Sequence, residues 1–232
     1  MQHISEILKQ MGATDPQRIG EMIGTSESTP TPEKSPRGNA KSYKSEQDEW
    51  REKIIPYGYR NCSFSTFKGS AKTIEPLRAY AQTWPPSNLI FYGPCGSGKT
   101  HLAVAILQEQ IDNGHWLSIW FVSATDLLME IKETFNDEST ISESDVIAKY
   151  TEEIDFLVID DLGAEFVTEW VIATFYRIID RRFRQGLPTL VTTNLTNYEI
   201  TERFGPRIAS RLSAYKLVLL QGRDARKNAN GQ

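Results

Sequence analysis

The sequence predicts an α/β fold in which a mainly parallel sheet is flanked by helices. Short apolar runs alternate along the chain with segments of helical periodicity, which is the pattern of repeated strand–helix units. A glycine-rich octapeptide, residues 93–100, stands between the first of these strands and a helical segment. A later apolar run ends directly before Asp160, and continuous runs of this kind are typical of strands buried on both faces.

The expected elements can be placed in chain order. The strands are expected at 87–92, 116–122, 154–159, 189–193 and 215–220. The helices are expected at 102–111, from 125 onward, at 145–150, 167–184, 198–204 and 207–212. Asn113-Gly114 ends the first of these helices, and Gly186 with Pro188 ends the long one. Gly205-Pro206 separates the last two.

Composition narrows the class of protein. The net charge is −4, 39% of the residues are hydrophobic, and no apolar run approaches the roughly 18 residues of a membrane span. The first eleven residues are amphipathic and do not resemble a secretory signal. Cys62 and Cys95 are too few for a disulfide framework or a four-cysteine zinc site. We therefore expect a cytoplasmic protein in a reducing compartment that makes no contact with a membrane.

The chain divides into three parts. Residues 1–24 are expected to form a short helical segment that docks on a partner, since Ile4, Ile7 and Leu8 share one helical face. Residues 25–49, rich in Ser, Thr, Pro, Lys and Gly, are expected to form a flexible linker. Residues 50–232 would form the α/β domain. A dispensable tail is the alternative interpretation of the first part.

Charge is distributed unevenly along the domain. Between His101 and Trp170 there are sixteen Asp and Glu against two Lys, whereas between Arg177 and Lys227 eleven Lys and Arg stand against four Asp and Glu. Such runs are often only solvated faces. The alternative is that the basic section meets nucleic acid, phosphate or an acidic protein surface.

The octapeptide reads G-P-C-G-S-G-K-T and matches a phosphate-binding loop. Its glycines let backbone N–H groups turn inward around a phosphate, and the following helix directs its N-terminal dipole at the same anion. Lys99 would reach the β- and γ-phosphates, and the Thr100 hydroxyl would ligate Mg²⁺. The candidate nucleotide-binding residues are Gly93, Pro94, Cys95, Gly96, Ser97, Gly98, Lys99, Thr100 and the adjacent His101. The alternative is a glycine-rich turn with an incidental lysine.

Polar side chains at the ends of later strands complete a hydrolytic site. Asp160 would face Thr100 across Mg²⁺, and Asp161 would orient or deprotonate the attacking water. Glu165, four residues on, is the second candidate for that role. Asn194 ends the fourth strand and would contact the γ-phosphate or the water if that strand neighbours the first and third. Turn and capping roles are the alternatives for these residues.

Two arginines share one face of the last expected helix. Arg207 and Arg211 are spaced i and i+4, and like charges at this spacing slightly destabilise an isolated helix. An anionic target would explain them, because an arginine supplied to a γ-phosphate accelerates hydrolysis. Solvated surface arginines are the alternative.

Together these motifs resemble the AAA+ ATPases and, within them, the DnaC/DnaI-like bacterial helicase loaders. The resemblance covers roughly residues 55–226 and rests on the strings I-P-Y-G-Y-R-N-C-S-F-S-T-F, G-P-C-G-S-G-K-T-H-L-A, F-L-V-I-D-D-L-G-A-E, P-T-L-V-T-T-N-L and R-I-A-S-R-L. The related IstB-like helper ATPases of insertion sequences share the same core.

The resemblance implies a fold and a set of residue roles. The fold would be a P-loop NTPase of the AAA+ type with a five-stranded parallel sheet, ATP would be the nucleotide, and Mg²⁺ the metal. Asp160 would be the Walker B aspartate, Asn194 the first sensor, and Arg211 an arginine finger acting in trans beside Arg207. Most AAA+ proteins carry Glu where this chain has Asp161. No C-terminal helical lid is expected, since the chain ends twelve residues after the fifth strand.

The resemblance also implies partners. The N-terminal segment would bind a replicative helicase, subunits would associate head-to-tail, and residues 125–150 would correspond to an insertion that lines a path for single-stranded DNA. Ten Asp and Glu against two Lys lie between Thr125 and Asp155, which is unfavourable for phosphate contacts. The basic C-terminal third is therefore expected to carry more of the DNA contact.

The expected function is an ATP-dependent helicase loader whose ATPase activity is weak in the isolated subunit. An IstB-like transposition helper is the alternative within the same class. A small-molecule or nucleoside kinase, or a nucleotide-gated adaptor without hydrolysis, are alternatives from other classes.

Overall fold

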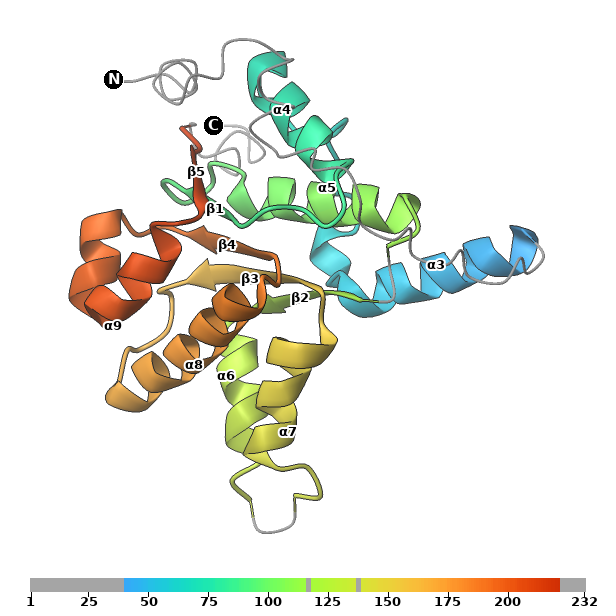
Figure 1. Cartoon of the computed structure of the whole chain (residues 1–232). Helices are drawn as coiled ribbons and strands as arrows, with labels where there is room; N and C mark the ends of the chain where they lie inside the picture. Colours follow the sequence, from blue (N-terminus) through green and yellow to red (C-terminus); the bar gives the residue numbers. More distant parts are fainter. Residues whose placement is uncertain (1–39, 116–117, 137–138, 222–232) are drawn as a thin grey trace, which may run out of the picture.

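A parallel five-stranded sheet in the order β2-β3-β4-β1-β5 forms the centre of the structure (Figure 1). The computed structural model describes residues 40–115, 118–136 and 139–221. The strands are β1 (Leu89–Tyr92), β2 (Ile119–Ser123), β3 (Phe156–Leu162), β4 (Thr189–Thr193) and β5 (Lys216–Leu219). Every pairing is parallel, so the predicted sheet is confirmed.

The strand order determines where polar side chains can meet. β4 pairs with β1 on one side and with β3 on the other. Because the carboxyl ends of parallel strands lie at the same edge of a sheet, the loops after β1, β3 and β4 are neighbours there. The condition set for Asn194, that its strand lies between the first and third, is therefore met.

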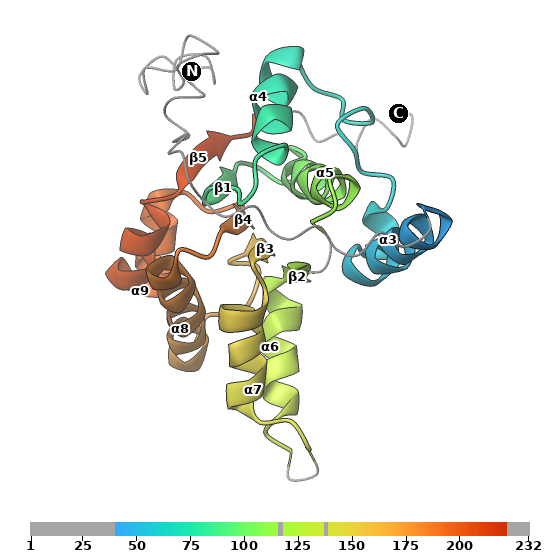
Figure 2. The same cartoon turned by 45° about the vertical axis from the view of Figure 1, so that its right-hand side comes forward.

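Helices cover both faces of the sheet. The described helices are α3 (Ala40–Ile54), η1 (Tyr57–Tyr59), α4 (Ala71–Ala81), α5 (Lys99–Asp112), α6 (Ala124–Glu133), α7 (Glu143–Ala148), η2 (Lys149–Glu153), α8 (Glu169–Gln185) and α9 (Asn197–Leu212). In Figures 1 and 2, α3, α4 and α5 lie on one face, while α6 to α9 lie on the other. None of the described helices is long and apolar enough to cross a membrane.

Successive side chains of each strand point to opposite faces of the sheet, so the core consists of two clusters, one on each face. In β3, Phe156 and Val158 pack in the cluster with α4 and α5, whereas Leu157 and Ile159 pack in the cluster with α6 to α9. All four side chains are fully buried. A strand that is apolar on both faces is what a three-layer α/β/α arrangement requires.

Several element boundaries differ from those expected. α6 is capped by Ser123, whose Oγ accepts the N–H of Asp126, so the helix begins before Thr125. The two expected C-terminal helices make up α9 and are separated as predicted, since Gly205 leaves the helical conformation with φ 83° and ψ 165°. α4 was not expected, and it contains Pro76 at its sixth position, where proline removes one helical hydrogen bond.

The boundary of the expected linker 25–49 is wrong at its C-terminal end. The helix α3 begins at Ala40, so ten of those residues are helical. The remainder of the linker and the expected docking segment 1–24 lie outside the described residues. The polar composition of α3 concealed it; Ile54 at its end is buried, and Trp50 packs against the same core cluster.

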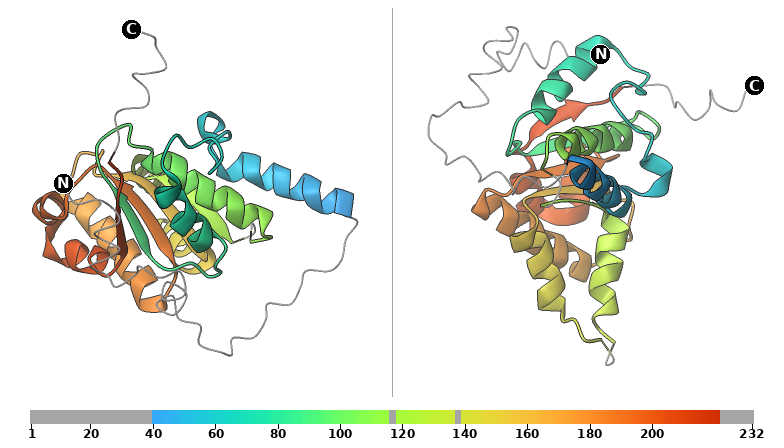
Figure 3. Two further views of the ribbon diagram at one scale, coloured as in Figure 1. Left: turned by 90° about the horizontal axis from the view of Figure 1, so that it is seen from above. Right: turned by 90° about the vertical axis from the view of Figure 1, so that its right-hand side faces the viewer.

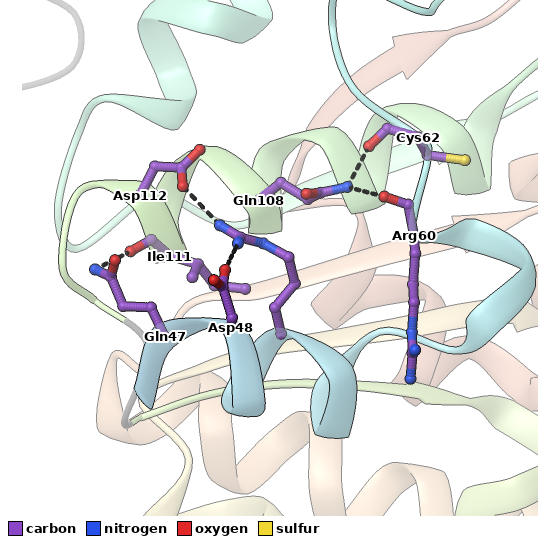
Figure 4. A network of polar contacts seen from close by, with 8 residues as sticks. Gln47, Asp48, Arg60, Cys62, Gln108, Ile111 and Asp112 are labelled. Atoms are coloured by element: carbon purple, nitrogen blue, oxygen red, sulfur yellow. Dashed lines mark hydrogen bonds and ion pairs between the residues drawn. The ribbon is translucent and has the colours of Figure 1, made fainter. Parts of the chain in front are cut away.

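Helix α3 lies beside α5 (Figure 3), and polar contacts attach it to the C-terminal end of α5 (Figure 4). Gln47 donates to the carbonyl oxygen of Ile111 at 3.1 Å, and Arg51 forms an ion pair with Asp112 at 2.6 Å. The carbonyl oxygen of Ile111 also accepts the N–H of Gly114 at 3.0 Å, so Gln47 adds a second donor at this helix end. The chain therefore enters the domain along the helix that begins at the phosphate loop.

The acidic and basic sections of the sequence meet within one subunit. Arg177 of α8 pairs with Glu143 at 2.5 Å, and Arg181 of α8 pairs with Glu152. Two arginines of the basic section therefore pair with carboxylates of the α7–η2 segment in the same subunit, at half-exposed positions. The pattern of charge along the sequence could not show this pairing, because the partners lie about thirty residues apart.

Arg182 is fully buried and joins four segments near the amino-terminal edge of β3 and β4. Its guanidinium donates to Thr189 Oγ1 and to the carbonyl oxygens of Tyr150, Ile154, Asp155 and Pro188. Burial lowers the pKa of this arginine to about 10. A buried cation is tolerated when its donors are all used, and the rigid fork of arginine suits several carbonyl groups at once.

We predict that Arg182→Met destabilises the protein by about 2–5 kcal/mol, because it leaves buried carbonyl groups without donors. Arg181→Met is the matched control, since it removes an exposed ion pair from the next residue and should cost less than about 1 kcal/mol. Urea unfolding followed by circular dichroism measures both. Equal losses in the two variants would contradict the role assigned to Arg182.

Candidate nucleotide-binding site

The phosphate loop connects β1 to α5 in a conformation that requires glycine. At Gly93, φ is 145°, and a Cβ atom would lie 2.2 Å from the carbonyl oxygen of Leu220. At Gly98, φ is 90°, and a Cβ atom would lie 2.4 Å from the ring of Phe67. Side chains are excluded at both positions, so the backbone is left to line the loop.

Lys99 is buried at the base of this loop, with 6% of its surface exposed. Its ammonium group donates to the carbonyl oxygens of Gly93 and Pro94, at 2.8 and 3.0 Å. It also donates to Asn194 Oδ1 at 2.5 Å. The loop carbonyls and the end of β4 therefore supply acceptors for this cation.

The environment of the Ser97 hydroxyl indicates whether the loop can hold a phosphate. Among the described residues, Ser97 Oγ is buried and has no hydrogen-bond partner. Most buried polar atoms in proteins are paired, and Ser97 Oγ is one of five buried side-chain atoms without a partner in the described residues. It lies in a loop that also holds a lysine ammonium at its base and the start of a long helix, and an anion suits that combination. The residues present therefore fit a triphosphate.

Asp160 and Thr100 are in contact at the edge of the sheet. Thr100 Oγ1 donates to both oxygens of Asp160, at 2.9 and 3.2 Å, as expected of two ligands to one Mg²⁺. Burial raises the pKa of Asp160, while hydrogen bonds from Thr192 and Thr100 oppose that rise. The pair is suited to a hard cation, because oxygen ligands with one carboxylate are what Mg²⁺ prefers.

Asp161 follows in an unusual backbone conformation. Its φ is 56°, the only positive value among the described residues other than glycine. Its N–H donates to Thr192 Oγ1 at 2.8 Å, and its carboxylate accepts from Asn194 Nδ2 at 3.0 Å. Strained residues of this kind cluster at functional sites. Asn194 thus bridges Lys99 and Asp161.

Glu165 has a different environment from Asp161. Its carboxylate accepts the N–H of Gly163 at 3.0 Å, in the loop that follows β3. Burial raises the pKa of Glu165. Glu165 thus binds its own loop, whereas Asp161 contacts Asn194, and a role in orienting water stays a prediction for both.

His101 lies against the lead-in to the domain. Its Nε2 atom is 2.8 Å from the carbonyl oxygen of Ser63, and its ring centroid is 5.3 Å from that of Phe67. Gln108, two turns further along α5, donates to the carbonyl oxygen of Cys62 at 2.7 Å (Figure 4). These contacts hold the segment 60–67 beside the phosphate loop. His101 therefore contacts that segment, and its role in nucleotide binding stays a prediction.

The structure does not bring the two arginines of α9 to this cluster. Arg211 donates to Asp180 Oδ1 at 2.8 Å and lies over the ring of Phe183. Arg207 lies over the ring of Tyr176. The hydrogen bond from Arg211 lowers the pKa of Asp180 and raises that of Arg211 itself. Both arginines thus pack on α8, and their proposed role in trans stays a prediction.

Two contributors to the site were missed in the sequence. Thr192 contacts both aspartates, and Phe67 packs over Gly98. The strings T-T-N and F-S-T-F contain these residues, but nothing in the local pattern separates Thr192 from its neighbour Thr193. Only the register between β3 and β4 distinguishes them.

Comparisons with known proteins agree with this geometry. The replicative helicase loader DnaC of Escherichia coli (strain K12) is 29% identical over 160 residues, which cover 66% of this chain and 64% of that protein. DnaC of Buchnera aphidicola subsp. Schizaphis graminum is 31% identical over the same length. DnaI of Bacillus subtilis is 31% identical over 132 residues, 55% of this chain and 40% of that protein. The chain therefore spans less than two thirds of these relatives.

Solved structures show the same fold. A crystal structure of the DnaC helicase loader superposes with a TM-score of 0.62 and 23% identity, over 72% of this chain and 100% of that one. A crystal structure of DnaI superposes with a TM-score of 0.60 and 22% identity, over 76% of this chain and 97% of that one. AMPPCP-bound DnaA from Aquifex aeolicus superposes with a TM-score of 0.58 and 18% identity, over 72% of this chain and 51% of that one. The predicted P-loop fold of the AAA+ type is confirmed.

The family model described as "IstB-like ATP binding protein" matches residues 58–212, which include the phosphate loop, both aspartates, Asn194 and both arginines of α9. The chain therefore belongs to the IstB-like ATP-binding proteins.

Proposed function

We propose that this protein is an ATP-dependent replicative helicase loader. The observation that carries the proposal is the cluster of Lys99, Thr100, Asp160, Asp161 and Asn194 at one edge of the sheet. Relatives that share this part of the chain are named replicative helicase loaders. In this function, ATP binding and hydrolysis act as a switch for assembly and release in DNA replication.

The residues of the cluster divide the chemistry of hydrolysis among them. Lys99 binds the β- and γ-phosphates in place of the loop carbonyls it now contacts, and Thr100 with Asp160 holds Mg²⁺. When bound, Mg²⁺ neutralises charge on the phosphate oxygens. Asp161 orients the attacking water, and Asn194 senses the γ-phosphate, because its amide already joins Lys99 to Asp161.

The proposed switch depends on a change in the hydrogen-bond acceptors of Lys99. Nucleotide binding removes Lys99 from the carbonyl oxygens of Gly93 and Pro94. That exchange occurs at the start of α5, and α3 is bonded to the other end of the same helix. The proposed helicase-binding segment 1–24 precedes α3. A rigid helix with the site at one end and the N-terminal connection at the other supports coupling between them.

Contact with single-stranded DNA is part of the proposal. Charge does not favour the acidic α6–η2 segment, and two α8 arginines are already paired with it. Exposed aromatic rings offer an alternative means of contact, since bases stack on them without regard to sequence. Phe135 and Phe166 are 53% and 88% exposed, and Phe135 packs edge-on against Trp170. We therefore place DNA contact on these rings as well as on the basic C-terminal third.

An IstB-like helper in transposition is the second candidate, favoured by the description of the matching family model. Both candidates use the same site, so the identity of the partner separates them. The N-terminal segment is where we place partner binding.

We predict that a tagged full-length chain, incubated with an extract of the cells in which the protein occurs, retains the replicative helicase. A variant lacking residues 1–24 should not retain it. Mass spectrometry identifies the retained proteins, and nucleotide binding by both variants confirms that the domain is intact. Retention of a transposase would contradict the loader and support the second candidate.

We also predict that Arg211 acts on the ATP site of a neighbouring subunit. Arg211→Ala should lower partner- or DNA-stimulated turnover by at least about tenfold with ATP affinity maintained. Arg184→Ala is the matched control, since Arg184 pairs with the same Asp180 carboxylate at 2.9 Å. It should leave turnover unchanged.

Mixing separates action in trans from action within one subunit. Arg211→Ala subunits retain an intact phosphate loop, and Lys99→Ala subunits retain Arg211. Their mixture should regain turnover that neither shows alone. Stimulated turnover that survives Arg211→Ala would contradict the arginine-finger role.

A further inference from the structure

We propose that Thr192 positions both aspartates of the site through its single hydroxyl group, and that this sets the dependence of nucleotide binding and turnover on Mg²⁺. The inference rests on the proposed function for its link to hydrolysis. Thr192 lies in the middle of the sheet on β4 and is fully buried.

A β-bulge places the two aspartates opposite this one residue. Ile159 pairs with Val191 and Leu162 pairs with Thr193, so Asp160 and Asp161 of β3 stand against Thr192 alone. A bulge of this kind interrupts the ladder of backbone hydrogen bonds and redirects side chains. The interruption falls where the strand carries its two carboxylates.

The hydroxyl of Thr192 replaces contacts that the bulge removes. It donates to Asp160 Oδ1 at 2.6 Å and accepts the N–H of Asp161 at 2.8 Å. A hydroxyl has one hydrogen and two acceptor lone pairs, so both bonds form at once. The same atom therefore fixes the direction of one carboxylate and the backbone of the next residue.

These two bonds act on different parts of the site. The bond to Asp160 leaves that carboxylate facing Thr100 Oγ1, the other residue placed at Mg²⁺. The bond from Asp161 holds its backbone at φ 56°, from which its side chain reaches Asn194 Nδ2. The metal-binding pair and the residue beside the attacking water are thus oriented from one point.

A purely structural threonine would behave differently on substitution. Valine has the shape of threonine and is equally suited to a buried strand, so it would replace a threonine that only packs. Here it would leave Asp161 N–H without an acceptor and remove a donor from Asp160. Groups that orient a metal ligand typically affect metal affinity or activity by about 10–100-fold when they are removed.

The first test uses the full chain without nucleotide. In Thr192→Val, the peptide that covers residues 156–163 should exchange its amide hydrogens faster than in the parent, since Asp161 N–H loses its acceptor. Thr192→Ser should restore the slow exchange. Thr151→Val is the matched control, because Thr151 is also fully buried but donates only to the carbonyl oxygen of Ile147 in the α7–η2 segment.

The second test measures binding of a fluorescent ATP analogue with EDTA and across a Mg²⁺ titration, followed by turnover. With EDTA, Thr192→Val should bind within about twofold of the parent, because the phosphate loop is unchanged. In the same variant, the Mg²⁺ concentration that gives half of the maximal change in analogue binding should rise by about tenfold or more. The kcat for ATP hydrolysis should fall to a similar extent. Thr192→Ser should recover both quantities, and Thr151→Val should match the parent.

The outcomes are distinguishable. Thr192→Val with unchanged exchange and unchanged Mg²⁺ dependence overturns the proposal, and so does a Thr192→Ser variant as impaired as Thr192→Val. If the parent shows no turnover with any partner, the proposed hydrolysis fails. The exchange and Mg²⁺-binding measurements still decide the role of Thr192 in that case.

Discussion

The site depends on keeping the Asp160 carboxylate buried at the carboxyl edge of the sheet, where only 5% of the residue is exposed. A charge in that position needs donors close by, because burial alone raises its pKa. Thr100 supplies one from the start of α5, and Thr192 supplies another from β4. The strand order makes this possible, since β4 lies between β1 and β3. The phosphate loop, the acidic strand end and Asn194 meet only because of that arrangement.

Lys99 is the second buried charge, and it is held by groups that a triphosphate would replace. Its present partners are carbonyl oxygens of its own loop and the amide of Asn194. Phosphate oxygens are anionic and accept stronger hydrogen bonds from an ammonium group than neutral carbonyl oxygens do. Replacing the carbonyl acceptors of Lys99 by phosphate oxygens therefore favours nucleotide binding. Asn194 then remains in contact with Asp161 while its other partner moves. Under the proposed function, this chain of contacts would relate occupancy of the phosphate loop to the position of Asp161, and α5 would extend the relation to α3.

Much of the fold could be predicted because its signals are local. The phosphate loop, the apolar strands and the helix ends are each written in fewer than about twenty consecutive residues. The features that were missed depend on register and on distant contacts. Thr192 differs from Thr193 only through the bulge in β3, and Arg177 meets Glu143 only after folding. The start of α3 was missed because a polar helix held by contacts to α5 resembles a linker in composition. The pairing of Arg211 with Asp180 is equally invisible in the sequence.

A crystal structure of the full chain with Mg²⁺ and a non-hydrolysable ATP analogue tests the central claim most directly. The account predicts that Lys99 Nζ leaves the carbonyl oxygens of Gly93 and Pro94, that Thr100 Oγ1 and Asp160 both turn to the metal, and that both bonds of Thr192 persist. A structure in which Lys99 keeps its contacts to the loop carbonyls while nucleotide is bound, or in which the Thr192 bonds are broken, would contradict the account.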